Sequence, residues 1–197
     1  MEPLSELSKT LTRRGYEAEV LASGAVAVDR VHDLIRGHSV GVGSSLTLRT
    51  LRLTETMQEH ASAVFLHTAG EAGASERSAL TADYFLTSAN AVSMDGHIVN
   101  IDGTGNRIAA TCFGPQHVIY LIGRNKIVDT LDQAMTRAKD AAVKLAKHYQ
   151  RKTPCVTTGK CEDCLSPQCI CAVTAIHRRK PAGARMSVFL IDEDLGI

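Results

Sequence analysis

Short apolar runs that alternate with helical patterns constrain the fold of this chain more than any other feature. Each run is only a few residues long, as expected for a buried strand, and the clearest are residues 39–42, 63–66, 84–86 and 118–122. Over residues 128–149, apolar side chains instead recur every three or four positions, which predicts a long amphipathic helix. Strands that alternate with helices predict an α/β fold, and we expect these four runs to share one largely parallel sheet.

Length and composition indicate a single domain over residues 1–197. Within it, residues 67–78 are small and polar, which predicts a loop that leads into a short helix. The net charge is +1 and aromatic residues make up 4% of the chain, so nothing indicates a nucleic-acid partner. No apolar run approaches the roughly 20 residues that span a bilayer, and the N-terminus lacks an apolar signal region. We therefore expect a cytoplasmic protein with no membrane partner.

Five of the six cysteines lie within residues 155–171, with the spacing C-x5-C-x2-C-x4-C-x-C. The Cys161 and Cys164 pair can present two thiolates to one metal from a tight turn, and the flanking cysteines can complete a four-sulfur set. Disulfides fit poorly because nothing indicates secretion, and the spacing alone permits zinc or an iron–sulfur centre. Composition changes at Arg151, so residues 151–180 are predicted to form a Cys-rich metal-binding insertion. The sixth cysteine, Cys112, lies in an apolar stretch and is predicted to be buried and inert.

Three glycine-bearing loops follow predicted strands or precede predicted helices, and such loops present backbone N–H groups to anions. Each could instead be an ordinary turn, but the carboxyl ends of parallel strands meet at one edge of a sheet, so we expect several of these residues to converge on a small anionic ligand. No catalytic set can be assigned. The candidate ligand-binding residues are Gly41, Gly43, Ser44, Ser45, Asn90, Asp95, Gly96, Asp102, Gly105, Asn106, Arg107, Asn125 and Lys126.

Several of these segments carry a family resemblance. The runs are LTSANA at 86–91, NIDGTGNR at 100–107, FGP at 113–115, GRNK at 123–126, VGVGSSLTL at 40–48 and EDLG at 193–196. Together they resemble the LUD domain family of lactate-utilisation proteins over nearly the whole chain. The resemblance implies a three-layer α/β fold similar to glucosamine-phosphate deaminase, ribose-phosphate isomerase and the CoA transferases.

A cysteine-bearing branch of that family has a pattern similar to C…GKCxDCxSPxRIC. The resemblance implies that Cys155, Cys161, Cys164 and Cys171 are the metal ligands. This chain departs from the pattern because Cys169 stands at the arginine position, which makes Cys169 the alternative fourth ligand. Only one close Cys-x2-Cys pair is present, whereas cysteine-built zinc sites usually have two. Together with the family's redox setting, this favours a 4Fe–4S cluster over zinc.

The resemblance implies a redox-linked protein of lactate or related organic-acid utilisation, which would bind a small anion and could work with redox partner proteins. Two other hypotheses remain open. One is a ligand-binding or regulatory protein with a structural zinc knuckle. The other is a transferase or isomerase acting on a phosphorylated or CoA-linked substrate, which rests on fold analogy alone.

Overall fold

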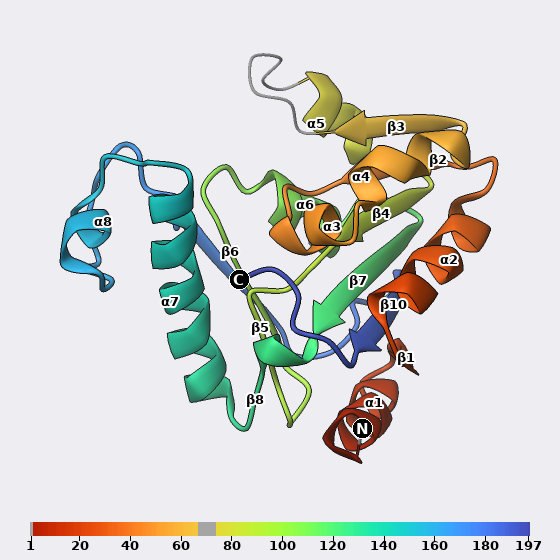
Figure 1. Ribbon diagram of the computed structural model, residues 1–197, viewed down its shortest axis with the longest axis horizontal. Coiled ribbons are helices and arrows are strands. Elements are labelled where there is room, and N and C mark those ends of the chain that lie inside the picture. The colour runs from red at the N-terminus through yellow and green to blue at the C-terminus, as the bar shows by residue number, and fades with distance from the viewer. Residues whose placement is uncertain (1, 67–73) are drawn as a thin grey trace.

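The computed structural model describes residues 2–66 and 74–197. Within them a six-stranded sheet forms the centre of the molecule, and every strand pairing in it is parallel (Figure 1). Its strands, in spatial order, are β1 (Glu17–Leu21), β10 (Arg185–Ile191), β7 (His117–Gly123), β4 (Tyr84–Thr87), β2 (Ser39–Val42) and β3 (Ala63–Leu66). The prediction that the four apolar runs share one parallel sheet is therefore confirmed.

One face of this sheet is covered by helices that follow β1 and β2. These are α2 (Gly24–Ile35), α3 (Leu46–Thr50), α4 (Leu53–Thr56) and the 3-10 turn η1 (Met57–Glu59). Ser23 starts α2, because its hydroxyl accepts a hydrogen bond from the backbone N–H of Val26. The helices bury Val31 and Leu48 against Leu121 of β7, and all seven residues of that strand are buried. A central parallel strand covered on both faces explains the uninterrupted apolar run in its sequence.

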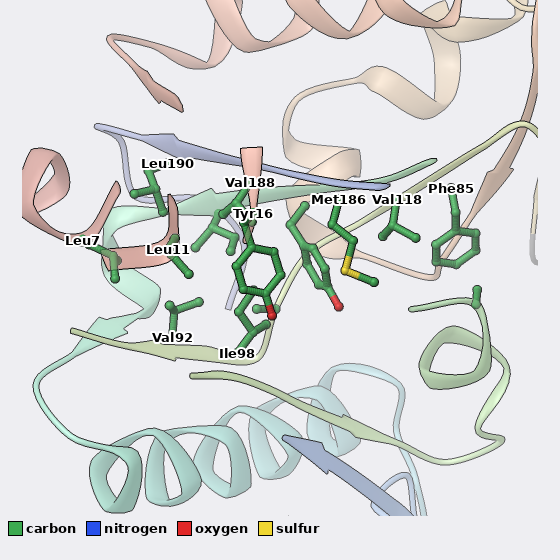
Figure 2. Packing of buried hydrophobic residues seen from close by; sticks show 14 of the residues in the cluster. Leu7, Leu11, Tyr16, Phe85, Val92, Ile98, Val118, Met186, Val188 and Leu190 are labelled. Carbon is green, nitrogen blue, oxygen red and sulfur yellow. The ribbon is translucent and has the colours of Figure 1, made fainter. Parts of the chain in front are cut away.

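The opposite face of the sheet packs against helices and a second sheet, which was not predicted. The helices are α1 (Glu2–Arg13) and α6 (Asn106–Cys112). The second sheet contains, in order, β8 (Ile127–Val128), β5 (Ala91–Ser93), β6 (Ile98–Asp102) and β9 (Val173–His177). Figure 2 shows Leu7 and Leu11 of α1 and Val188 of β10 packed with Val92 and Ile98 of this second sheet. The whole is a three-layer-like α/β arrangement with a mostly parallel central sheet, as predicted.

Helix α7 (Leu131–His148) lies on the outer face of the second sheet, where Ala134 and Ala138 pack against Val99 (Figure 1). It begins at Leu131 rather than at the predicted residue 128. Thr130 fixes this start, because its hydroxyl accepts from the Gln133 backbone while the Gln133 side chain accepts from the Thr130 N–H.

The remaining described elements are short: α5 (Ala74–Ala79), η2 (Arg124–Lys126) and α8 (Pro154–Thr158). The short helix predicted at the end of the 67–78 loop is α5, while residues 67–73 of that loop lie outside the described residues. From α7 the chain runs through α8 and the cysteines into β9. The cysteine segment is therefore placed beside α7, next to the second sheet.

Candidate functional site

A pocket of about 310 Å³ lies at the carboxyl edge of the six-stranded sheet. Three loops that follow parallel strands line it: Ser44 and Ser45 after β2, Ser88 and Asn90 after β4, and Lys126 after β7. The β6–α6 connection, the end of α7 and the cysteine segment close its other sides. Ligands of open α/β sheets bind at this edge, and the volume suits a small molecule.

Arg107 is held at the start of α6 by its neighbours. The Asp102 carboxylate accepts hydrogen bonds from the backbone N–H groups of Arg107 and Ile108, at 3.1 and 3.2 Å. The guanidinium group donates to the Ser88 carbonyl at 3.3 Å, to Asn90 Oδ1 at 3.0 Å and to the Ile101 carbonyl at 2.6 Å. Burial lowers the pKa of Arg107, but an arginine stays protonated at neutral pH. Arg107 is therefore a fixed, preoriented positive charge in the pocket wall.

Gly43 makes room for this arginine. A Cβ atom at position 43 would lie 3.1 Å from the Arg107 side-chain methylenes and 3.2 Å from the Thr87 hydroxyl oxygen. Such contacts are tighter than ordinary packing, so a larger residue would push the Arg107 side chain out of its place.

Lys126 is the second cation of the pocket and is only 4% exposed. Its ammonium nitrogen Nζ donates to Thr47 Oγ1 at 2.7 Å, to Ser88 Oγ at 3.0 Å and to the Ala89 carbonyl at 3.2 Å. All three partners are neutral oxygens. Burial, together with the nearby positive charges of Arg137 and Arg107, lowers the pKa of Lys126 to about 7.

The charges of the pocket are unbalanced toward positive. Among the described residues that line it, the cations are Arg49, Arg107, Lys126 and Arg151, and the carboxylate is Asp102. Since the Asp102 carboxylate is already bonded to the start of α6, an incoming anion would compensate positive charge that Asp102 alone does not balance.

Sulfate binding to this pocket should tighten by about tenfold or more when the pH falls from about 9 to about 6. Sulfate keeps its charge over this range, while Lys126 gains a proton. A bound anion favours the ammonium form of Lys126, so the bound state holds more protons and binding weakens as the pH rises through about 7. Isothermal titration calorimetry across the range measures this, and Lys126→Met should flatten the dependence. Equal affinities of the wild-type protein for sulfate at the two ends of this pH range would contradict the assignment of the pH dependence to Lys126.

Not all of the predicted ligand-binding residues reach the pocket. Those that line it are Ser44, Ser45, Asn90, Asp102, Asn106, Arg107 and Lys126. Gly43 does not line the pocket but lies next to the Arg107 side chain. Gly105 immediately precedes α6 with a φ of 85°.

The other four predicted residues lie elsewhere: Gly41, Asp95, Gly96 and Asn125. Asp95 and Gly96 form the turn between β5 and β6, where Asp95 accepts a hydrogen bond from His97 Nδ1 at 2.8 Å. Gly41 packs against Ala79, and Asn125 Oδ1 accepts from the Leu195 N–H at 3.0 Å.

The pocket also contains residues that were not predicted, chiefly Arg49, Ser88, Tyr149 and Arg151. Arg49 and Arg151 were missed because each is an isolated basic residue near a helix end. Ser88 was missed because it lies inside the LTSANA run and belongs to no recognisable binding motif. A usable signal for Ser88 was its place directly after a predicted strand, between that strand and Asn90.

All five clustered cysteines line a second, small cavity of about 30 Å³ against Ala142, Val143 and Ala146 of α7. Burial first, and then the neighbouring Cys169, Cys161 and Cys164 thiols, together raise the pKa of Cys171 to about 11. In residues 2–66 and 74–197, no three His, Cys, Asp or Glu side chains are gathered into a metal-holding group. The donor chemistry of the cavity nevertheless fits a sulfur-ligated centre.

The two cavities share a wall. Ile170, between Cys169 and Cys171, lines both the cysteine cavity and the pocket. A Cβ atom at Gly103, in the pocket, would come within 3.0 Å of the Ile170 backbone. The cysteine segment thus packs directly on the loop that follows Asp102.

The prediction that Cys112 is buried is wrong. Cys112 is the last residue of α6 and is exposed, while Ile108, Ala110 and Thr111 are the residues of that helix that face the interior. Its sulfur lies 3.8 Å from Nε2 of His177, and Cys112 is not among the residues that line the cysteine cavity.

Together, these features define the class: a three-layer-like α/β protein with a cation-lined pocket at the carboxyl edge of its parallel sheet. The family model of the LUD domain matches residues 4–191, and the chain belongs to this family. A DUF162 family protein from Deinococcus radiodurans has a similar fold, with a TM-score of 0.57, 17% sequence identity and 96% of each chain covered. No curated protein matches the chain. Among the described residues, no helix is both long and apolar enough to cross a membrane.

Proposed function

We propose that this LUD domain protein serves the oxidation of lactate or a related organic acid. In this proposal the cation-lined pocket binds the carboxylate of the acid. The cysteine cavity carries an iron–sulfur centre, expected to be a 4Fe–4S cluster, and a redox partner protein exchanges electrons with it.

The observation that carries the proposal is the shared wall at Ile170. A cation-lined pocket and a cavity lined by five thiols adjoin each other in one domain, and both include Ile170 in their walls. A redox centre works on a neighbouring ligand only at short range, whereas a purely structural zinc knuckle has no need to lie beside a ligand pocket. This proximity therefore favours a redox role.

Four cysteines would hold the centre: Cys155, Cys161, Cys164 and Cys171, with Cys169 as the alternative fourth ligand. Thiolates are the usual ligands of iron–sulfur clusters, and a bound cluster would supply one-electron transfer at this place. The apolar α7 side chains around the cavity would limit solvent access to it, which tunes the potential of such centres.

The cofactor assignment is tested by purifying the protein without oxygen and assaying iron, acid-labile sulfide and zinc. We expect about four iron and four sulfide per chain. Stoichiometric zinc without iron or sulfide would overturn the redox role and favour a structural knuckle. Protein without any metal and with all thiols free would remove the site altogether.

Serine substitutions identify the ligands. Cys161→Ser and Cys164→Ser should lose most of the iron, because each removes one of the two closely spaced thiolates. Cys169→Ser should retain it. The matched control is Cys112→Ser, since this exposed cysteine lies outside the cavity. Retention of iron in Cys171→Ser with loss in Cys169→Ser would show that Cys169 is the fourth ligand instead.

A further inference from the structure

Ser88 and Lys126 form a close pair in the wall of the anion pocket. Both residues line the pocket, both side chains are buried, and their Oγ and Nζ atoms are 3.0 Å apart. The described hydrogen-bond partners of Lys126 include no carboxylate, and the charged groups that act on it, Arg107 of α6 and Arg137 of α7, are both cations. A buried lysine in such surroundings is readily deprotonated.

The hydrogen bonds around Lys126 show which atom its neutral form would act on. The Thr47 hydroxyl donates its hydrogen to the Leu195 carbonyl at 3.3 Å, so toward Lys126 it accepts. The Ala89 carbonyl can only accept. A neutral amine has two hydrogens and one lone pair, so the hydrogens go to these two oxygens. The lone pair is left to accept the hydrogen of the Ser88 hydroxyl.

We propose that Ser88 and Lys126 are a nucleophile and general base for acyl transfer, acting on an ester or thioester that also bears a carboxylate. The inference rests on the anion pocket of the proposed function, which would hold that carboxylate, and is independent of the metal centre. A hydroxyl bonded to a neighbouring base is the arrangement that activates serine nucleophiles, and lysine serves as the base in some of them. The pKa of Lys126, about 7, leaves a large neutral fraction at physiological pH.

The reaction follows from the two side chains. Ser88 Oγ forms a bond to the carbonyl carbon of the substrate while its proton passes to Nζ of Lys126. The π electrons of the carbonyl move onto its oxygen, near the positive charge of Arg107, whose Nη1 is bonded to the Ser88 backbone. Collapse of this adduct breaks the bond to the alcohol or thiol, which takes the proton from Lys126. Water, deprotonated by Lys126, then hydrolyses the acyl-serine and restores the hydroxyl.

The same geometry disfavours Lys126 as the nucleophile. Its Nζ is surrounded by Cε and by three oxygen partners, so no tetrahedral position faces the pocket. Among the described residues, Lys126 is the side-chain partner of the Ser88 hydroxyl, which keeps lone pairs for attack.

The test uses mono-4-nitrophenyl succinate, an activated ester with a free carboxylate. Wild-type protein should release a burst of nitrophenolate equal to the protein concentration, and peptide mass spectrometry should place the succinyl group on Ser88. Ser88→Ala should abolish the burst, and Lys126→Met should slow acylation by at least about a hundredfold. The acylation rate should rise with pH through the pKa of Lys126. Lys9→Met, on the exposed side of α1, is the matched control and should keep the burst.

Sulfate titrations separate the possible failures. If wild-type protein binds sulfate but shows no burst, or if the succinyl group is on Lys126 or a cysteine, the Ser88–Lys126 pair is overturned while the anion pocket stands. An unchanged acylation rate in a folded Lys126→Met variant also overturns the pair. Wild-type protein that binds no sulfate removes the pocket on which both proposals depend.

Discussion

Arg107→Ala is expected to weaken sulfate binding by about 1.5–3 kcal/mol, roughly ten- to a hundredfold in affinity, because it removes charged hydrogen bonds to the anion. Part of the loss comes from the wall itself, since Asn90 Oδ1 and the Ile101 carbonyl lose the donor that now satisfies them. Titration calorimetry at constant pH measures the effect. Arg107→Lys should have a sulfate affinity between those of the wild type and Arg107→Ala, since lysine keeps the positive charge but lacks the planar guanidinium group.

The control for Arg107 is Arg36→Ala. Arg36 is an exposed cation at the end of α2, paired with Asp33 and outside the pocket. The Arg36→Ala protein should bind sulfate as the wild type does. The far-ultraviolet circular dichroism spectra of Arg107→Ala, Arg107→Lys and Arg36→Ala should all match that of the wild type. Undiminished sulfate binding by a folded Arg107→Ala protein would place the anion elsewhere.

Leu121→Ala is expected to lower the free energy of unfolding by about 2–5 kcal/mol. Leu121 is fully buried in the central strand β7. It packs in the hydrophobic cluster between the six-stranded sheet and helices α2–α4. Removing its side chain leaves a cavity that close-packed neighbours cannot fill. Denaturant-induced unfolding measures the change.

The matched control is Leu165→Ala, in the cysteine segment. Leu165 is 99% exposed, so its truncation should shift the free energy of unfolding by no more than about 0.5 kcal/mol. A Leu121→Ala cost as small as that of Leu165→Ala would mean that β7 is not at the centre of the fold.

The parallel sheet was predictable because its strands are buried on both faces. Their sequences are continuous short apolar runs, which stand out against the helical patterns between them. The second sheet left a weaker signal, since only its strand β6 is a buried run of ordinary strand length. In β9, Val173 and Ile176 are partly exposed and only His177 is buried, while β5 and β8 are three and two residues long. These strands are defined by pairing with distant parts of the chain, which one sequence does not reveal.

The candidate site was predictable where its residues follow strands of the parallel sheet, as Ser44, Asn90 and Lys126 do. Asp95 and Gly96 share the same residue types but do not reach the pocket. The antiparallel β5–β6 hairpin explains this, because its strands leave the pocket at Asn90 and return at Asp102, so the turn between them lies at the far end.

The cations from helix ends were not predictable in the same way. Arg49 and Arg151 reach the pocket only because α3 and the end of α7 are packed at the same edge of the sheet. A single basic residue on a helix otherwise reads as a solvated surface charge, so its role depends on tertiary packing.

The most direct test of the central claim is the electron paramagnetic resonance spectrum of anaerobically purified, dithionite-reduced protein, recorded with and without saturating lactate. The claim is that a redox centre held by the cysteines adjoins the anion pocket across Ile170. It predicts the signal of a reduced 4Fe–4S cluster, and a change in that signal when lactate binds. A signal that lactate leaves unchanged, or no signal from protein that contains only zinc, would contradict it.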